Sequence, residues 1–243
     1  MAPRTPVRTV IPTVIADPPD TPEDLYSSNL NFFLQTPWTA SIIRSDDAVP
    51  LILQCRNPKS PLHDQLFGTT LLPDQAIPHM LSVMHLGGRE QRKQQLDDPG
   101  RPIRSVSTLY HVGHGLTGGP GVLHGGMMTA MVDEAMGALT EVNSALGKTA
   151  EAFNGFSVTG ALEVKFLRPI FTGTTVVVRA RLGRVERRKA RVTCEKKKKK
   201  KKNKNKKKNR GYVCWRQWPC VRVMKSIAND EITQKKRKRY VRR

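Results

Sequence analysis

The feature that most constrains this chain is the stretch Gly126-Met-Met-Thr-Ala-Met-Val-Asp-Glu-Ala-Met-Gly-Ala-Leu139, in which only Thr129, Asp133 and Glu134 are polar. A helix that is apolar nearly all round belongs in an interior, so we predict a long central helix from about Gly125 to Ala145. An unpaired buried carboxylate is costly, which suggests that Asp133 has a partner or a chemical role. The alternative is that Asp133 and Glu134 form a narrow solvent-exposed stripe along this helix.

Strand patterns flank the predicted helix on both sides. Ser105–Val112 before it has the composition of a strand. After it, β-branched residues and approximate alternation mark 156–167, 174–185 and 188–194. A strand, a long helix and then consecutive hairpin strands predict an α+β fold, with an antiparallel sheet wrapped around one long central helix. We place this domain at residues 104–224.

The N-terminal part of the chain has weaker patterns. Residues 1–20 are rich in Pro, Thr and Val and are interpreted as a disordered leader. Residues 21–103 are interpreted as an N-terminal extension with short helices. One is expected to begin with Thr21 as its N-cap and to end near Phe33, and the other to span 75–86. The charged, Gly- and Pro-bounded segment 87–104 is predicted to be a loop.

The positive charge of the chain is concentrated near its C-terminus. Residues 196–243 hold 22 of the 42 Lys and Arg residues and two of the 20 acidic ones, so the formal net charge of +22 describes this segment and not the body. The Lys/Asn run 196–210 is predicted to be a low-complexity insertion in a hairpin loop, because it cannot build a core. Tyr212–Met224 is predicted to be a last strand that pairs with 188–195. Residues 225–243 then form a basic tail.

The cysteine pattern and the N-terminus bear on the location of the protein. Cys55, Cys194, Cys214 and Cys220 form no CxxC pair and have no His partners at zinc spacing, which favours free thiols inside the cell and predicts no metal site. No apolar run approaches the roughly 18 residues that span a bilayer. A cytoplasmic location is favoured. A mitochondrial one is the alternative, because basic residues and no acid precede Asp17.

The entrance to the central helix has the composition of an oxyanion site. His124-Gly125-Gly126 places two residues without side chains where the free backbone N–H groups of a helix point outward. Glycine costs helix stability, but it lets a ligand carbonyl approach the backbone closely. The exposed N–H groups and the positive end of the helix would stabilise an oxyanion there. The alternative is an ordinary Gly-rich turn.

Several motifs together resemble one family. His124-Gly-Gly followed by Asp133, and then Phe166-Leu-Arg-Pro169 with Gly173, resemble the hotdog-fold acyl-CoA thioesterases, particularly the phenylacetate-degradation type. The stretch 113–126, Trp38 and Arg56-Asn-Pro-Lys59 are similar to its fungal branch. The resemblance is good over about 105–195, thinner over 21–104 and poor after 195.

The resemblance implies roles for individual residues. The oxyanion donor is the backbone N–H of Gly125, the catalytic nucleophile or general base is Asp133, and Thr159 helps to place the attacking water. His124 is expected to orient the turn, and Glu134 to be structural or at a dimer interface. Substrate contacts are assigned to His124, Gly126, Glu134 and Arg168. Many relatives have Asn or Gln on the loop before the His, where this chain has Gly118-Gly119.

Helix geometry indicates a dimer. The eight residues between Gly125 and Asp133 correspond to about 12 Å along a helix, whereas catalytic groups must lie within about 3 Å of the reacting atoms. One helix therefore cannot offer both groups to one carbonyl. The resemblance implies antiparallel helices of two subunits, so that Gly125 of one faces Asp133 of the other, in a homodimer or a dimer of dimers.

Three functions are compatible with these observations. The leading one is hydrolysis of an acyl-CoA thioester to a carboxylic acid and free CoA, without a cofactor or metal. The second is a hydratase of the same fold, whose carboxylate–histidine motif we do not find. The third is a non-catalytic protein that binds acyl-CoA, or that binds nucleic acid or an anionic surface through residues 196–243. Steep salt dependence would distinguish a nucleic-acid contact from thioester turnover.

Overall fold

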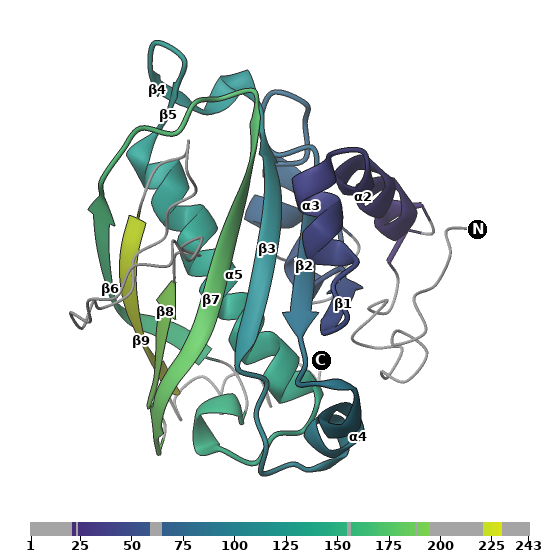
Figure 1. The fold of residues 1–243 in the computed structure, drawn as a ribbon. Coiled ribbons are helices and arrows are strands. Elements are labelled where there is room, and N and C mark those ends of the chain that lie inside the picture. The colour runs from purple at the N-terminus through teal and green to yellow at the C-terminus, as the bar shows by residue number, and fades with distance from the viewer. Residues whose placement is uncertain are drawn as a thin grey trace, which may run out of the picture.

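The computed structural model describes residues 21–22, 24–58, 65–154, 157–187, 189–194 and 221–229. In this part of the chain an antiparallel sheet curves around one long helix, α5, and shorter helices cover the outer face and one end of the sheet (Figure 1). The predicted α+β class, with a sheet wrapped around a central helix, is confirmed.

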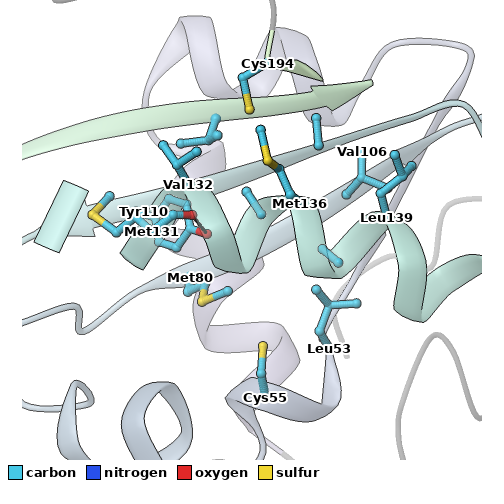
Figure 2. Close-up of a cluster of buried hydrophobic side chains, with 14 of the residues drawn as sticks. Leu53, Cys55, Met80, Val106, Tyr110, Met131, Val132, Met136, Leu139 and Cys194 are labelled. Carbon is cyan, nitrogen blue, oxygen red and sulfur yellow. Dashed lines mark hydrogen bonds between the residues drawn. The ribbon is translucent and has the colours of Figure 1, made fainter. Parts of the chain in front are cut away.

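The central helix α5 spans Gly125–Ala145, as the apolar pattern predicted. Met131, Ala135, Met136 and Leu139 have no exposed surface, and they pack between the strands (Figure 2). The hydroxyl of the fully buried Tyr110 donates a hydrogen bond of 2.8 Å to the carbonyl of Met131. A polar group in this core therefore has its partner, as buried polar groups require.

The main sheet has seven strands in the order β1-β2-β3-β7-β8-β9-β6, and all neighbours are antiparallel. The predicted strands around α5 are found with small shifts at their ends. The bounds are Ala48–Leu51 for β1, Met80–His85 for β2, Ser105–Val112 for β3, Ser157–Phe166 for β6, Thr174–Glu186 for β7, Lys189–Cys194 for β8 and Val221–Asn229 for β9.

The N-terminal region contains the expected short helices and also contributes two strands, β1 and β2, to the same sheet. The helix predicted over 75–86 is wrong, because Met80–His85 forms β2 and pairs with β3. Met80 and Met84 face α5, whereas Leu81 and Val83 face the outer helices. A strand buried on both faces shows no alternation, which is why its pattern resembled a helix. The edge strand β1 accommodates Pro50, as edge strands can.

The outer face of the sheet is covered by α2, Leu25–Leu34, and α3, Pro37–Ile43 (Figure 1). The first helix begins with Asp24 as its N-cap and not with Thr21, and a second helix begins at Pro37. Both pack on Leu81, Val83 and Leu109 in a second hydrophobic cluster. The sheet is therefore the middle layer between α5 and these two helices.

The predicted loop 87–104 contains a helix, α4, which spans Arg89–Asp97. Its sequence is too polar to show an apolar stripe, so its support comes from elsewhere in the fold. The buried Lys148 donates from Nζ to the carbonyls of Gln95, Leu96 and Asp98 at 2.6, 3.0 and 2.8 Å. These bonds satisfy carbonyls that a helix C-terminus leaves without partners.

The last described strand, β9, pairs with β8 as expected and also with β6 on its other side. It continues to Asn229, beyond the predicted domain end at 224, so residues 225–229 belong to the sheet and not to a tail. Residues 212–220 of the predicted strand lie outside the described residues. The predicted leader 1–20, the insertion 196–210 and the tail beyond 229 also lie outside them.

Smaller elements complete the described chain. The hairpin of β4, Thr117–Gly119, and β5, Val122–Leu123, lies beside the start of α5. Cys55 and Cys194 are buried. No helix in the described ranges is both long and apolar enough to cross a membrane. Short helical turns are found at Gln54–Arg56, Leu66–Thr70, His114–Leu116 and Glu151–Phe153.

Candidate active site

Asp133 and Thr159 are brought together by the packing of β6 against α5. Thr159 Oγ1 donates a hydrogen bond of 2.8 Å to Asp133 Oδ1. The register between β6 and β9 shifts between Thr159 and Ala161, so Gly160 is the extra residue of a β-bulge. Bulges commonly redirect a neighbouring side chain. Asp133 is half-buried and Thr159 is exposed, which leaves this pair accessible from the edge of the sheet.

The entrance to α5 is organised by His124. The His124 side chain is the N-cap and its Nδ1 accepts a hydrogen bond of 3.0 Å from the Gly126 N–H. That donor is therefore occupied within the chain. For the Gly125 N–H, no acceptor is found among the described residues. Gly125 is exposed and lies at the positive end of the helix, where a negative oxygen is stabilised.

A cavity of about 390 Å³ adjoins Gly125. A Cβ at Gly125 would lie 3.7 Å from the ring of Phe166, so this ring forms the wall beside the helix entrance. The cavity can hold an apolar group beside the Gly125 N–H, with one cation, Arg168, nearby. Its lining is otherwise formed by Val122, Leu123, Met128, Leu167, Pro169 and Ile170.

Exposed apolar side chains next to this cavity were not singled out from the sequence. Phe166, Leu167 and Phe171 are 53, 48 and 54 % exposed, and large apolar side chains in such a group mark a ligand or partner surface. The sequence feature that could have indicated this surface is the apolar pair Phe166-Leu167 directly before Arg168-Pro169. In the sequence these apolar residues are indistinguishable from the inward-facing end of a strand.

The loop before His124 explains one departure from the family pattern. A Cβ at Gly118 would lie 2.8 Å from the Cα of His124, so no side chain fits there without moving the backbone. A Cβ at Gly119 would meet nothing within 4 Å. The polar side chain that many relatives carry on this loop is thus excluded at one glycine and sterically allowed at the next.

Glu134 lies away from the Asp133–Thr159 pair. It is half-buried, and its charge acts on the core hydroxyl of Tyr110. Burial raises the pKa of Tyr110 well above its ordinary value, and the Glu134 carboxylate raises it further. Successive side chains of an α-helix point about 100° apart, so the side chains of Asp133 and Glu134 face different parts of the structure.

The described part of the chain contains no group of three His, Cys, Asp or Glu side chains that could hold a metal ion. The groups brought together in one chain are a carboxylate with a hydroxyl and, about 12 Å along the helix, a backbone donor beside an apolar cavity.

Residues 120–203 match the family model described as the Thioesterase superfamily. The family resemblance inferred from the sequence is confirmed for this segment, and the sheet that curves around α5 is the hotdog arrangement that the resemblance implied.

Two curated relatives were found. The chain is 30% identical over 136 residues to verlamelin biosynthesis protein B of Lecanicillium sp, which covers 49% of this chain and 58% of that protein. It is 34% identical over 86 residues to acyl-coenzyme A thioesterase THEM4 of Bos taurus, covering 35% of this chain and 31% of that protein. The chain therefore spans less than two thirds of the length of either relative.

Solved structures of low identity are also similar. One is a putative thioesterase of Ralstonia eutropha JMP134, described as phenylacetic acid degradation-related, which is 22% identical. The matched region covers 51% of this chain and 76% of that chain, with a TM-score of 0.38. A hypothetical thioesterase of Streptococcus pneumoniae TIGR4, solved with coenzyme A, is 9% identical, covers 52% and 79%, and also gives a TM-score of 0.38.

Proposed function

We propose that this protein hydrolyses acyl-CoA thioesters to a carboxylic acid and free CoA. The observation that carries the proposal is the hydrogen bond between Thr159 and Asp133 in a domain of the thioesterase superfamily. A half-buried carboxylate held beside a hydroxyl is suited to activate a water or to attack a carbonyl. The similarity to an acyl-coenzyme A thioesterase supports CoA as the carrier of the acyl group.

In the proposed reaction the thioester oxygen lies at the start of α5. The Gly125 N–H donates to this oxygen, which becomes negative when the carbonyl carbon is attacked, and the helix end stabilises that charge. The acyl group lies in the cavity walled by Phe166 and Leu167. Asp133 then acts as general base on a water that Thr159 helps to position, or as the nucleophile itself. His124 acts by holding the turn through Gly126, while Arg168 is placed to meet a negative group of the substrate.

The proposed active site needs two chains. Strand β6 is the last strand of the sheet, and along it the described chain pairs only with β9. An open edge ten residues long is a ready surface for a second copy, because its backbone groups can pair across a two-fold axis. Val158, 41 % exposed on the same strand, would be covered. The partner's helix entrance would then face the Asp133–Thr159 pair.

The other functions have less support. Binding of an acyl-CoA without turnover would not require a carboxylate hydrogen-bonded to Thr159. Binding of nucleic acid through residues 196–243 rests on charge alone. Residues 21–103 are proposed to be part of the thioesterase domain, since β1 and β2 belong to its sheet.

The test is an assay of free-thiol release with a panel of acyl-CoA substrates of increasing chain length and with aromatic acyl groups. We expect turnover of at least one member that saturates with substrate and does not fall steeply with salt. The absence of thiol release across the panel, with acyl-CoA binding retained, would favour the binding protein instead.

A further inference from the structure

A second cavity, of about 520 Å³, lies on the sheet face opposite α5. Its volume is within the range of small-molecule sites, about 300–1,000 Å³. Arg179 and Arg181 line it from β7, where they share the outer face with Val177, which packs on the cluster under α2 and α3. Arg104 lines it from the residue before β3, and Arg101 from the loop after α4.

This cavity is remote from the helix entrance of the same chain. Arg104 also lines a neighbouring cavity that contains Lys148, three residues beyond the C-terminal end of α5. Gly125 lies at the other end of this helix, whose 21 residues span about 30 Å. Figure 1 shows α4 and the β4–β5 hairpin at opposite ends of the molecule. A ligand in the outer cavity therefore does not occupy the proposed acyl site of this chain.

Positive charge dominates the described lining. It has four guanidinium groups and one carboxylate, that of Asp47. Asp47 already accepts a hydrogen bond of 2.7 Å from Ser45 Oγ and lies 3.2 Å from His85 Nδ1. One of the four arginines, Arg101, forms an ion pair outside the lining, with its Nε 3.2 Å from Asp98 Oδ2. The charge balance of the lining favours an anion over a neutral or cationic ligand.

A part-buried hydrogen-bond network fixes one of the arginines. His85 Nε2 is 2.8 Å from Ser107 Oγ, and Arg179 Nε donates to the same oxygen at 2.8 Å. Asp47, His85 and Ser107 follow the order of a hydrolase triad. However, Ser107 has no exposed surface, and its oxygen already accepts a bond from Arg179. The network therefore holds the Arg179 guanidinium in place and does not attack a substrate.

We propose that this outer cavity binds the phosphate group of a small phosphorylated molecule, with Arg104, Arg179 and Arg181 as its contacts. A guanidinium presents its donors in a planar fork that matches two oxygens of a phosphate. A phosphate dianion matches several guanidinium groups better than a single carboxylate does. The volume leaves room for a group attached to the phosphate. This proposal is independent of the reaction at Asp133.

Isothermal titration calorimetry of the full chain at fixed ionic strength tests the proposal, with ADP, inorganic phosphate and adenosine as probes. We expect saturable binding of ADP at one site per chain, and no binding of adenosine. If ADP binds more tightly than inorganic phosphate, the attached group contributes. If the two bind equally, the phosphate alone is recognised. Either result supports a phosphate site.

The variants Arg104→Gln and Arg181→Gln separate this cavity from other basic groups. Each should weaken ADP binding at least about tenfold, because a charge-assisted hydrogen bond is lost. Arg104 is exposed, so its variant should fold even if the half-buried Arg181 proves necessary for stability. Arg184→Gln is the matched control. Arg184 is exposed on β7, the strand that carries Arg181, and it is paired with Glu186 and lies outside the lining.

Three results would overturn the proposal. They are the absence of saturable binding of either phosphate probe, equal binding of adenosine and ADP, and an Arg104→Gln variant that binds ADP as tightly as the Arg184→Gln control. The last result would assign the binding to another basic region, such as residues 196–243.

Discussion

Thr159 Oγ1 donates a hydrogen bond to Asp133 Oδ1 at 2.8 Å, and this bond joins the edge strand β6 to the middle of the central helix α5. It places a carboxylate at the boundary of the sheet, where a second copy of the chain can reach it. The bulge at Gly160 lies directly beside it, so the backbone at this point departs from the regular ladder.

Replacing Asp133 by Asn should abolish turnover while the protein stays folded. The loss of the activated nucleophile or base should lower kcat by at least about 100-fold. Thiol release measures the rate, and circular dichroism checks the fold. Glu163→Gln, which removes an exposed acid on β6, is the control and should remain near wild type. An Asp133→Asn protein within threefold of wild type would remove this residue from the mechanism.

The Thr159 hydroxyl should matter for catalysis more than for folding. Thr159→Ala removes a hydrogen bond to a carboxylate, which should lower kcat by about 10-fold to 100-fold. Thr159→Ser keeps the hydroxyl and should recover most of the rate. Steady-state kinetics of both variants separate kcat from KM. Equal losses in the Ala and Ser variants would point to the methyl group and to packing instead.

Two inactive variants should complement each other if the site lies between subunits. Gly125→Pro removes the donor N–H at the first helical position, where proline is tolerated. The space there is adequate, because a Cβ would lie 3.7 Å from Phe166. Mixing it with Asp133→Asn creates one intact site per mixed dimer. At equal mixing about half of the dimers are mixed, so activity should approach about a quarter of wild type.

The complementation needs evidence that mixed dimers form. Native mass spectrometry of differently tagged chains gives that evidence. Zero recovered activity in a sample with demonstrated heterodimers would mean that each site is built within one chain, even if the reaction is as proposed.

Gly118 and Gly119, the two glycines of β4, should differ in their tolerance of a side chain. Gly118→Ala should lower the unfolding free energy by about 1–3 kcal/mol, because its Cβ would lie 2.8 Å from the His124 backbone. Gly119→Ala should stay close to wild type, since that Cβ meets nothing within 4 Å. Urea unfolding compares the pair. Equal stability of the two variants would contradict the close packing of this loop against His124.

Stability should fall as the solution becomes mildly acidic. Burial lowers the pKa of His79, and the neighbouring His111 and Arg56 lower it further, while Asp74 opposes them. Burial also lowers the pKa of His111, as does His114. Because these folded-state pKa values lie below the ordinary 6.5, the unfolded chain binds more protons in the interval between them. The stabilisation is full above pH 6.5 and is lost as the pH falls through 6.5 towards the folded values.

The variant His79→Phe isolates this effect. A phenyl ring can keep the stacking on Phe32, where the ring centroids are 3.8 Å apart, without titrating. Urea unfolding at about pH 7.5 and about pH 5.5 should show a smaller loss of stability in the variant than in wild type. An identical loss in both proteins would show that His79 does not contribute.

The sequence by itself determined the elements whose patterns are local. The apolar stretch of α5 predicted a buried helix from Gly125 to Ala145, and strand composition predicted β3. Approximate alternation predicted β7 and β8, because buried and more exposed residues alternate along much of both strands. Its resemblance to the hotdog-fold acyl-CoA thioesterases also implied Asp133 and Thr159 as site candidates.

Only the tertiary structure decided the elements and contacts that depend on distant residues. Strand β2 is buried on both faces and carries no alternation, and α4 depends on Lys148, more than 50 residues along the chain, to cap its carbonyls. The direct bond from Thr159 to Asp133 requires β6 to lie against α5. The outer cavity gathers Arg104 and Arg179 from segments 75 positions apart. Such contacts join residues that are far apart in the sequence, and the local sequence pattern around each residue does not indicate its distant partner. They form only when the sheet packs around the helix.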